Sequence, residues 1–556
     1  MKKIFTFLFI SFCAINISFA QVTQEWVARY IGPNNSNDEP GNIGIDKFNN
    51  IIITGRSRNE NNHSCFCTIK YNTQGVQQWI QKYSDTYNIQ GAHSLAIDTS
   101  GNIYVTGNSE HGVPIIKYNN NGVQQWKIIC KLDTLNNISA NNGFKILLDR
   151  ENNPVVIVNY HTNYSGDDYV IIKYSQNGDS LWVRKYNGPE NQHDLPQDMT
   201  VDKYGNIYAI GSSYKYNFII KYKPNGDTAW SRRYLPVNAQ YGYPQSIALD
   251  SKGNVCVTGY TYFGAVGSFY LTVKYDSNGV FKWSRIYDGF GTSNASRGIC
   301  VDSKDNIIVT GNISDMIISD IFTIKYDSKG EILWTGRYSG LHGGYNVGGN
   351  LVTDSFNNIY ITGSTYGGGA QNNSDYCTIK YNQYGNILWV MNYDGPIGGL
   401  RDNAYDIVLD KENNVIVSGS SLGSSGISSD YDYATIKYSQ FVGVNPISSN
   451  IPDRFELYQN YPNPFNPSTK IRYQIPLSRG VDSDGALADI GGRGVFVKLA
   501  VFDILGKEVT TLVNEQKKPG TYEVEWNGTN YSSGLYFYKL IADGVVVDTK
   551  KLVLLK

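Results

Sequence analysis

An internal repeat constrains the fold of this chain of 556 residues more than any other feature of its sequence. The repeated segment begins with Asp, passes through a short polar turn and ends in a β-branched run that is usually closed by Thr-Gly. It starts at Asp46, Asp98, Asp149, Asp202, Asp250, Asp302, Asp354 and Asp410, with spacings of 48 to 56 residues. A period of this length is typical of a β-propeller, in which each repeat builds a blade of four strands.

Recurring elements predict the four strands of each unit. The run after each Asp turn, such as Ile51-Ile52-Ile53, is β-branched and predicts a strand. An Ile-Lys-Tyr or Val-Lys-Tyr run predicts the next strand, and Trp-x-x-x-Tyr predicts another, because residues four apart face the same side of a strand. A short run before each Asp, as in Ser94–Asp98, supplies the remaining strand. We therefore predict four antiparallel strands per unit.

Counting these elements predicts closure into a ring of eight blades. No Trp strand follows the last Lys-Tyr element at Ile436–Tyr438, whereas an additional Trp strand stands at Trp26–Tyr30. If the blade boundary precedes the Trp strand, the blades are contiguous. If the boundary follows it, Trp26–Tyr30 completes the last blade and closes the ring, and in both cases only short edges remain. The third unit, with Pro154 and without Thr-Gly, departs furthest from the pattern.

The repeats resemble the SBBP-type β-propeller repeat, with its Asp-x-x-Gly-Asn-x-Tyr-x-Thr-Gly core and the Lys-x-x-x-x-Gly turn after it. The resemblance covers about residues 22–440, and we predict a propeller of eight repeats over residues 21–440. It implies an architecture and leaves the activity open, because propellers host many functions.

The first 20 residues have the features of a secretory signal peptide. Two lysines precede an apolar stretch, and Ser18-Phe19-Ala20 forms a small-x-small cleavage site. A membrane anchor is the alternative, but the apolar stretch is short. A lipidation site at Cys13 is disfavoured by the bulky Phe12 before it. We therefore predict a cleaved signal at residues 1–20 and export from the cytoplasm.

Six cysteines remain after the signal, and none forms a C-x-x-C pair. They are Cys65, Cys67, Cys130, Cys256, Cys300 and Cys377. We interpret them as small buried apolar side chains, although an export compartment permits disulfides whose pairing the sequence does not reveal.

The composition shifts after the last repeat. A polar linker is predicted at residues 441–452, and alternating strands over residues 453–556 predict a small Ig-like β-sandwich. The box Tyr461-Pro-Asn-Pro-Phe-Asn-Pro467, the turn Phe502-Asp-Ile-Leu-Gly-Lys-Glu508 and a basic end resemble the type A C-terminal sorting domain of the bacterial type IX secretion system. One departure is the Gly/Asp-rich insertion Ser478–Gly494, expected to be a surface excursion or a proteolytic site.

The resemblance implies an export route with two partners. The chain would cross the inner membrane by its signal, fold in the periplasm and pass the outer membrane through the type IX secretion machinery. A sorting-domain peptidase would then remove the C-terminal domain. The mature protein would be attached to the outer-membrane surface or released outside the cell.

Charge and motif content exclude several classes of function. Lys and Arg number 48 against 49 Asp and Glu, a balance that argues against a nucleic-acid binder. No stretch after the signal approaches the roughly 20 apolar residues of a transmembrane span. No H-E-x-x-H, G-x-S-x-G, P-loop or dinucleotide fingerprint occurs. We therefore assign no catalytic and no cofactor-binding residue.

Acidic residues provide the remaining candidates for a site. The Asp that opens each repeat is interpreted as a turn former, and the repeated Lys as a stem lying along the blade face. Four other carboxyls each stand three residues before a Thr-Ile-Lys-Tyr or Ile-Ile-Lys-Tyr run: Asp168, Asp320, Asp375 and Asp432. They are weak candidates for an acidic arc that holds a cation such as calcium. The alternative is hydrogen bonding at the entry of the strand.

The loops between blade strands lead to the functional hypothesis. Tyr366–Tyr376 and Ser420–Tyr433 are rich in Gly, Ser, Asn and Tyr, a mixture that suits carbohydrate or protein surfaces but also suits soluble connections. We predict a secreted or cell-surface propeller that acts as a non-enzymatic binding or scaffold protein. The alternatives are an extracellular hydrolase or lyase working at the propeller funnel, and a purely structural surface-layer protein.

Overall fold

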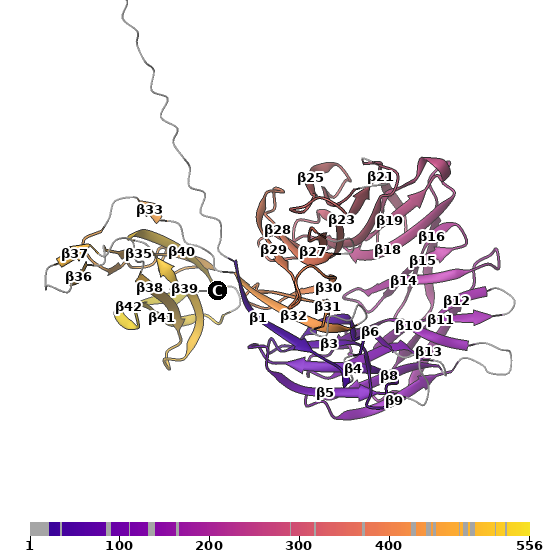
Figure 1. The fold of residues 1–556 in the computed structure, drawn as a ribbon, viewed down its shortest axis with the longest axis horizontal. Helices are drawn as coiled ribbons and strands as arrows, with labels where there is room; N and C mark the ends of the chain where they lie inside the picture. The colour runs from indigo at the N-terminus through magenta and orange to yellow at the C-terminus, as the bar shows by residue number, and fades with distance from the viewer. Residues whose placement is uncertain are drawn as a thin grey trace, which may run out of the picture. The chain divides into compact units, whose positions relative to one another are not determined.

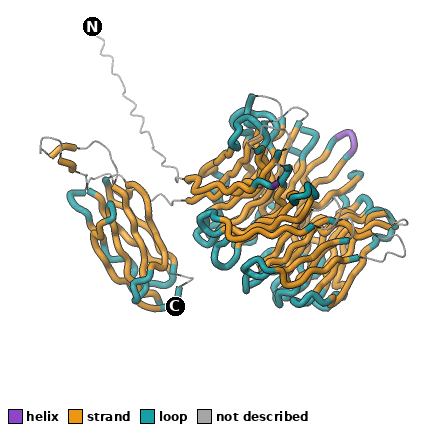
Figure 2. Tube along the Cα trace, turned by 60° about the horizontal axis from the view of Figure 1, so that its bottom comes forward, coloured by secondary structure: helices purple, strands orange, loops and turns teal. Residues whose placement is uncertain are grey.

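The computed structural model describes residues 22–33, 36–84, 91–109, 112–131, 139–162, 166–289, 291–315, 318–369, 373–423, 430–440, 446–448, 452–476, 479–481, 487–489, 495–517, 519–528 and 531–555. The predicted signal peptide at residues 1–20 lies outside this set. Contacts divide the chain into two compact units, one of residues 24–439 and one that contains residues 440–556. Strands dominate the regular structure of the described residues, which also contains a single-turn 3₁₀ helix at Gly264–Val266, and this confirms the all-β prediction (Figure 2).

The first unit consists of four-stranded antiparallel sheets, which we call blades and number along the chain. Blades 1 to 4 contain β2 (Glu39–Ile45), β3 (Ile51–Arg58), β4 (Ser64–Tyr71), β5 (Gln77–Tyr83); β6 (Gly91–Ile97), β7 (Ile103–Asn108), β8 (Val113–Tyr118), β9 (Gln124–Cys130); β10 (Ser139–Leu148), β11 (Pro154–Thr162), β12 (Gly166–Tyr174), β13 (Ser180–Tyr186); and β14 (Asp194–Val201), β15 (Ile207–Ser213), β16 (Tyr216–Tyr222), β17 (Thr228–Tyr234). Blades 2 and 3 are linked by one bridge between Asn108 and Asn142.

Blades 5 to 8 repeat the same order of strands. They contain β18 (Tyr241–Leu249), β19 (Val255–Tyr262), β20 (Ser268–Tyr275), β21 (Phe281–Tyr287); β22 (Ala295–Val301), β23 (Ile307–Ser314), β24 (Ser319–Tyr326), β25 (Ile332–Tyr338); β26 (Val347–Thr353), β27 (Ile359–Tyr366), β28 (Ser374–Tyr381), β29 (Ile387–Tyr393); and β30 (Asp402–Leu409), β31 (Val415–Leu422), β32 (Tyr431–Gln440), β1 (Val22–Tyr30). Blade 8 thus takes its fourth strand from the other end of the propeller sequence.

The blades form a closed ring, which confirms the propeller class. Each first strand contacts the first strand of the next blade, from β2 through β6, β10, β14, β18, β22, β26 and β30 back to β2 (Figure 1). β1 pairs with β32, so the structure follows the alternative in which the N-terminal Trp strand completes the last blade. Arg29 of β1 reinforces this closure, because its guanidinium lies 2.7 Å from the carboxylate of Asp432. Closure removes the open edge that an unpaired strand would leave.

The repeated Trp and Lys join neighbouring blades. In blade 1, Trp79 Nε1 and Lys70 Nζ both donate to the backbone oxygen of Asn120 in blade 2, at 3.1 and 3.4 Å. The turn glycine of blade 2, Gly122, packs against the Trp79 ring with φ of 79°. Equivalent pairs of donors meet at the oxygens of Thr73, Gln176, Pro224, Ser277, Ser328 and Gln383. We call this arrangement the outer clamp.

The repeated Asp forms the turn that was predicted for it. Asp46 Oδ1 accepts the backbone N–H groups of Phe48 and Asn50, at 2.8 and 2.9 Å. Burial would raise the pKa of Asp46, but hydrogen bonds from Asn50 and Lys70 outweigh it and hold the pKa below its usual value. The prediction for the repeated Lys concerned its alkyl stem and did not anticipate where the ammonium group ends, which for five of the eight is a buried ion pair. These pairs are Lys70–Asp46, Lys173–Asp149, Lys274–Asp250, Lys325–Asp302 and Lys437–Asp410.

The six cysteines carry no disulfide, and five of them are buried, with Cys300 partly exposed. Burial raises the pKa of Cys65 to about 11 and of Cys256 to about 12. These thiols therefore stay protonated at neutral pH and behave as small apolar side chains, as predicted.

The C-terminal unit contains two four-stranded sheets around one core. The strands are β33 (Pro446–Ser448), β34 (Glu456–Leu457), β35 (Ser468–Ile475) and β40 (Gly520–Asn527) in one sheet, and β38 (Val495–Phe502), β39 (Glu508–Lys517), β41 (Gly534–Ala542) and β42 (Val545–Leu554) in the other. Ile471 and Tyr473 of the first sheet share a cluster of buried side chains with Val497, Leu499 and Tyr538 of the second. Alternating apolar residues on each strand build this core.

Two features of the C-terminal unit differ from the sequence-based expectation. β33 lies inside the predicted linker and pairs with β40, because the backbone of Pro446–Ser448 finds a free edge there. Within the predicted insertion, β36 (Arg479–Val481) and β37 (Leu487–Asp489) form a two-stranded antiparallel sheet. The described part of the insertion is therefore a hairpin.

Candidate functional site

Every first strand of the propeller carries a register shift at the same place. Each shift is a β-bulge, which leaves a residue unpaired in the ladder and re-aims its side chain. The residues at the bulges are Gly41, His93, Phe144, Gln197, Gln245, Arg297, Gly349 with Asn350, and Tyr405. Because the first strands adjoin one another around the ring, these positions form what we call the bulge ring.

The glycine of the repeated Thr-Gly explains why the bulge recurs. A Cβ on Gly259 would lie 2.0 Å from the backbone oxygen of Tyr243, immediately before the bulge of blade 5. On Gly419 it would lie 2.0 Å from the oxygen of Asn403 in blade 8. Only glycine permits such a close approach of two backbones. Blade 3 has Asn159 at this position, and its first strand shows two register shifts.

The bulge ring is where the blades differ. The outer clamp and the Asp turn repeat nearly the same residues around the propeller, whereas the bulge residues range from glycine to arginine and aromatic side chains. His93, Arg297, Asn350 and Tyr405 are exposed. Variable exposed residues on a constant rigid framework are the usual arrangement of a binding surface.

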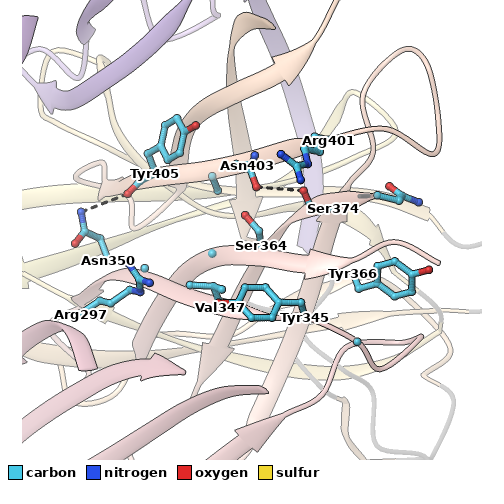
Figure 3. A pocket seen from close by; sticks show the side chains of 15 residues that line it. Arg297, Tyr345, Val347, Asn350, Ser364, Tyr366, Ser374, Arg401, Asn403 and Tyr405 are labelled. Atoms are coloured by element: carbon cyan, nitrogen blue, oxygen red, sulfur yellow. Dashed lines mark hydrogen bonds between the residues drawn. The ribbon is translucent and has the colours of Figure 1, made fainter. Parts of the chain in front are cut away.

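A cavity of about 880 Å³ opens at the bulges of blades 6, 7 and 8. Arg297, Asn350 and Tyr405 come from the bulges of β22, β26 and β30. The segment before β26 adds Tyr345, and the end of β27 adds Tyr366. Figure 3 shows Arg297, Asn350 and Tyr405 on the left of the view and Val347 and Tyr345 at its lower centre, with Asn350 hydrogen-bonded to the backbone of Tyr405. Residues separated by more than a hundred positions therefore meet in one site.

Hydrogen bonds hold most polar side chains of this cavity in place. Asn350 Nδ2 donates to Asp406 Oδ1 at 2.9 Å and to the backbone oxygen of Tyr405 at 3.4 Å. The hydroxyls of Tyr405 and Ser420 lie 2.8 Å apart. Burial raises the pKa of Tyr405, so its phenol remains a protonated donor at neutral pH.

Arg297 differs from these side chains. Its guanidinium is exposed to the cavity and makes no hydrogen bond or ion pair with any described residue. Arg401 brings a second guanidinium to the lining. None of the described residues that line the cavity is Asp, Glu, His, Cys or Lys. The cavity is therefore cationic.

The four predicted acidic candidates lie in four different blades and do not form one site. Asp432 pairs with Arg29, and Asp320 accepts from Arg337 Nε at 2.5 Å. Asp168 is a buried residue of β12, 1% exposed. Three of the four are thus buried in separate blades, two of them against arginines, which matches the strand-entry alternative more closely than an arc.

Asp375 is the exception, because it meets two carboxyls that the sequence analysis did not single out. One oxygen each of Asp375, Asp394 and Asp402 lies within 4.8 Å of the others. Burial and the two neighbouring carboxylates raise the pKa of Asp375 to about 6. Asp402 is held by the backbone N–H of Gly395 at 2.7 Å. Asp402 has counterparts in Asp38 and Asp194, which accept from the backbone of Gly32 and Gly188 in the same way. This repeated Tyr-x-Gly segment followed by Asp was a signal that the sequence analysis did not use.

The two predicted loops both contribute to the neighbourhood of the cavity. Tyr366, Asn373 and Ser374 of the first loop line it, and Ser374 Oγ donates to Asn403 Oδ1 at 3.1 Å. Ser420 of the second loop bonds Tyr405. Residues 370–372 and 424–429 of these loops lie outside the described part of the chain.

Family comparisons identify both parts of the chain. Residues 459–555 match the secretion system C-terminal sorting domain, and residues 78–112 match the β-propeller repeat of the SBBP family. An uncharacterised WD repeat-containing protein of Acanthamoeba polyphaga mimivirus is 30% identical over 193 residues, which span 26% of this chain and 14% of that protein.

Several solved structures match the chain at low identity and with TM-scores below 0.5. Sqt1 of Chaetomium thermophilum is 10% identical, covering 75% of this chain and 98% of that one, with a TM-score of 0.46. The WD40 domain of SCAP from fission yeast is 9% identical, covering 75% and 97%, with a TM-score of 0.41. The polysaccharide lyase Uly1 is 11% identical, covering 75% and 99%, with a TM-score of 0.40.

The sorting domain indicates export to the cell surface or the extracellular space and interaction with the secretion machinery. Among the described residues, no helix has the length and apolar character needed to cross a membrane. The chain carries a β-propeller repeat of the SBBP family at residues 78–112 and a type IX secretion system C-terminal sorting domain at residues 459–555.

Proposed function

We propose that the exported propeller is a non-enzymatic binding protein and that the cavity at the bulges of blades 6 to 8 is its ligand site. The observation that carries this proposal is the guanidinium of Arg297, which pairs with none of the described residues, in a concave site whose other polar side chains are held by hydrogen bonds. The cavity volume of about 880 Å³ lies within the usual range for small-molecule sites.

The repeated residues and the variable residues have different contacts, and this difference supports a binding role. The repeated Trp, Lys, Asp and Gly residues serve the outer clamp, the turns and the close approach at the bulge. The bulge residues of blades 6 to 8 are not needed for these contacts. Their exposed donors are available to a ligand, whereas a purely structural surface-layer protein has no need of such a cavity.

Catalysis is the less favoured alternative for this site. A hydrolase or a lyase needs a positioned base or nucleophile, and the described lining residues supply no carboxyl, imidazole or thiol. The raised pKa of Tyr405 makes its phenol a hydrogen-bond donor rather than a base near neutral pH. Incubating the protein with each ligand that binds and analysing the ligand by mass spectrometry tests this point, because turnover would favour the enzyme alternative.

The proposal also includes the export route of the protein. Residues 1–20 would direct the chain across the inner membrane, and the sorting domain would engage the type IX machinery and its peptidase. Removal of the sorting domain would leave the propeller attached to the surface or released. Deleting residues 453–556 is expected to retain the propeller in the periplasm, which cell fractionation measures, and mass spectrometry of exported wild-type protein is expected to find a C-terminus upstream of residue 459.

Binding is tested with the purified full chain against a broad panel of glycans and peptides on an array. Hits are expected for the wild type and are expected to be lost or weakened in Arg297→Ala and Tyr405→Phe. Tyr384→Phe is the matched control, since Tyr384 is 71% exposed and does not line the cavity. Hits that are unchanged in both cavity variants would refute this location of the site.

A further inference from the structure

We infer that the ligand of this cavity is an anionic sugar chain, whose carboxylate or sulfate group is bound by Arg297. This inference rests on the proposed function of the same cavity and names its ligand class. It follows from three properties of the lining: the position of Arg297, the neutral side chains around it, and the absence of acidic groups among the described lining residues.

The backbone at the bulge of β22 holds Arg297 facing the cavity. Ser296 before it is fully buried, and its Oγ donates to the backbone oxygen of Gly259 in blade 5 at 2.5 Å. A Cβ on the following Gly298 would lie 2.6 Å from Leu351 of blade 7. Both neighbours of Arg297 are therefore wedged between blades. The side chain re-aimed by the bulge extends from a rigid base.

The guanidinium makes no hydrogen bond or ion pair with any residue that the structure describes, and it is suited to an anion. Its planar array of N–H donors fits a carboxylate or a sulfate through two parallel hydrogen bonds. The carboxyl of Asp406 already accepts from Asn350 at 2.9 Å and from Asn42 at 2.7 Å. The exposed guanidinium of Arg297, with no carboxyl among the described lining residues, favours an anionic ligand.

The neutral part of the lining favours a sugar over an acidic peptide. Tyr345, Tyr366 and Tyr405 bring aromatic surface, on which the C–H face of a sugar ring can pack. Asn350 and Asn403 can each donate and accept hydrogen bonds, as the neighbouring hydroxyls of a sugar do.

The test measures binding of the purified full chain by isothermal titration calorimetry to oligosaccharides of matched length. The probes are a galacturonic-acid oligomer, a sulfated galactose oligomer and a neutral galactose oligomer. At least one anionic probe is expected to bind at least about tenfold more tightly than the neutral one, because charge-assisted hydrogen bonds are stronger than neutral ones. The two anionic probes distinguish a carboxylate from a sulfate. Binding is expected to weaken as salt concentration rises.

Variants separate this inference from the proposed function. Arg297→Ala is expected to weaken anionic binding at least about tenfold, and Arg297→Lys to restore part of it as a point charge. Arg150→Ala is the matched control, because Arg150 is an exposed arginine outside the cavity. The melting temperature of each variant verifies that the fold is intact.

The outcomes are distinct. Equal binding of neutral and anionic oligomers that depends on Tyr405 and not on Arg297 would overturn the anionic ligand and leave the binding site in place. Binding of peptides alone at this cavity would overturn the sugar class in the same way. If none of the three sugar probes binds, the inference of an anionic sugar ligand is overturned. If, in addition, no hit on the glycan and peptide array depends on the cavity residues, the proposed binding function is refuted as well.

Discussion

The outer clamp and the bulge ring are built from strands of the same blades, yet the clamp has nearly constant side chains and the bulge ring has variable ones. The clamp repeats Trp, Lys and Gly in blade after blade and buries them against the next blade. The bulge ring repeats a backbone feature while its side chains change from blade to blade. The comparison shows how a repeat protein can vary a site without losing its fold: the contacts that carry stability and the residues that carry recognition sit on different strands.

Breaking a buried ion pair of the framework is expected to have the largest effect on stability. Lys325 and Asp302 are 2.8 Å apart with side chains 2% and 0% exposed. Lys325→Met would leave the Asp302 carboxylate buried without its cation and is expected to cost about 3–5 kcal/mol. Urea denaturation of the full chain measures this loss. Lys282→Met is the control, because its pair with Asp276 is more exposed and contributes less than about 1 kcal/mol; similar losses in both variants would contradict the assignment.

Replacing the glycine that permits the bulge is expected to have the second-largest effect on stability. Gly259→Ala places a methyl group 2.0 Å from the oxygen of Tyr243 and is expected to cost about 1–3 kcal/mol, since backbone must move. Gly349→Ala is the control, because its nearest neighbour lies at 3.2 Å. Thermal unfolding measures the stability of both variants. If Gly259→Ala has the same melting temperature as the wild type, the close approach of the two backbones does not require glycine at this position.

A pair of tryptophans isolates the hydrogen bond of the outer clamp. Trp230 Nε1 donates to the oxygen of Ser277 at 3.1 Å, whereas Trp389 Nε1 is buried and has no partner among the described residues. The two side chains are 9% and 7% exposed. Trp230→Phe is therefore expected to cost about 1 kcal/mol more than Trp389→Phe. If a denaturant titration finds equal losses of unfolding free energy in the two variants, packing of the ring, and not its hydrogen bond, stabilises the outer clamp.

The carboxyl cluster beside the cavity predicts a pH dependence. The pKa of Asp375 is raised from 3.8 to about 6, so folding disfavours its ionised form. Its contribution to stability is highest below about pH 4 and is lost as pH rises through about 6. Asp375→Asn is expected to stabilise the protein at pH 8 by about 1 kcal/mol, after allowance for solvent screening. Melting curves from pH 4 to 8 measure this, and a wild-type slope retained in the variant would contradict it.

The same variant tests the calcium hypothesis for this cluster. If Ca²⁺ binds Asp375, Asp394 and Asp402, added calcium is expected to raise the melting temperature of the wild type at pH 8 and not that of Asp375→Asn. An identical response of the two proteins would exclude the cluster as a calcium site.

The smallest stability effect is expected in the bulge ring itself. Arg297 is exposed and makes no hydrogen bond or ion pair with any described residue, so Arg297→Ala is expected to change the free energy of unfolding by less than about 0.5 kcal/mol. Urea denaturation measures this change. A large loss of stability would show that Arg297 contributes to the framework, and the distinction between the outer clamp and the bulge ring would then be wrong.

Much of the fold could be predicted from local patterns, and some of its contacts could not. The Asp turns, the β-branched second strand and the Trp strand were all visible, because turn chemistry and strand alternation act within a few residues. The buried Lys–Asp pairs were missed although both members repeat. A repeated Lys reads as a surface residue unless the partner that neutralises it can be located in space.

The candidate site was less accessible to sequence reasoning. Tyr366 and Ser374 fell within a loop that the composition singled out, but Arg297 and Tyr405 lie in short first strands with no distinguishing motif. The acidic arc was a weak hypothesis based on matched positions in four blades, beside the alternative of strand-entry hydrogen bonding. Matched positions recur around the ring, so the four carboxyls lie in four different blades, and Asp375 meets Asp394 and Asp402 instead.

The sequence by itself determined the repeat, the strands and turns of each blade, and the sorting domain, because each depends on a pattern contained in a short stretch of chain. Only the tertiary structure decided that β1 closes blade 8, that Trp and Lys converge on one carbonyl of the next blade, and that Arg297, Asn350 and Tyr405 share a cavity. Those outcomes depend on how one blade stacks against the next and on a bulge that turns a side chain out of the ladder, and neither is encoded within a single repeat.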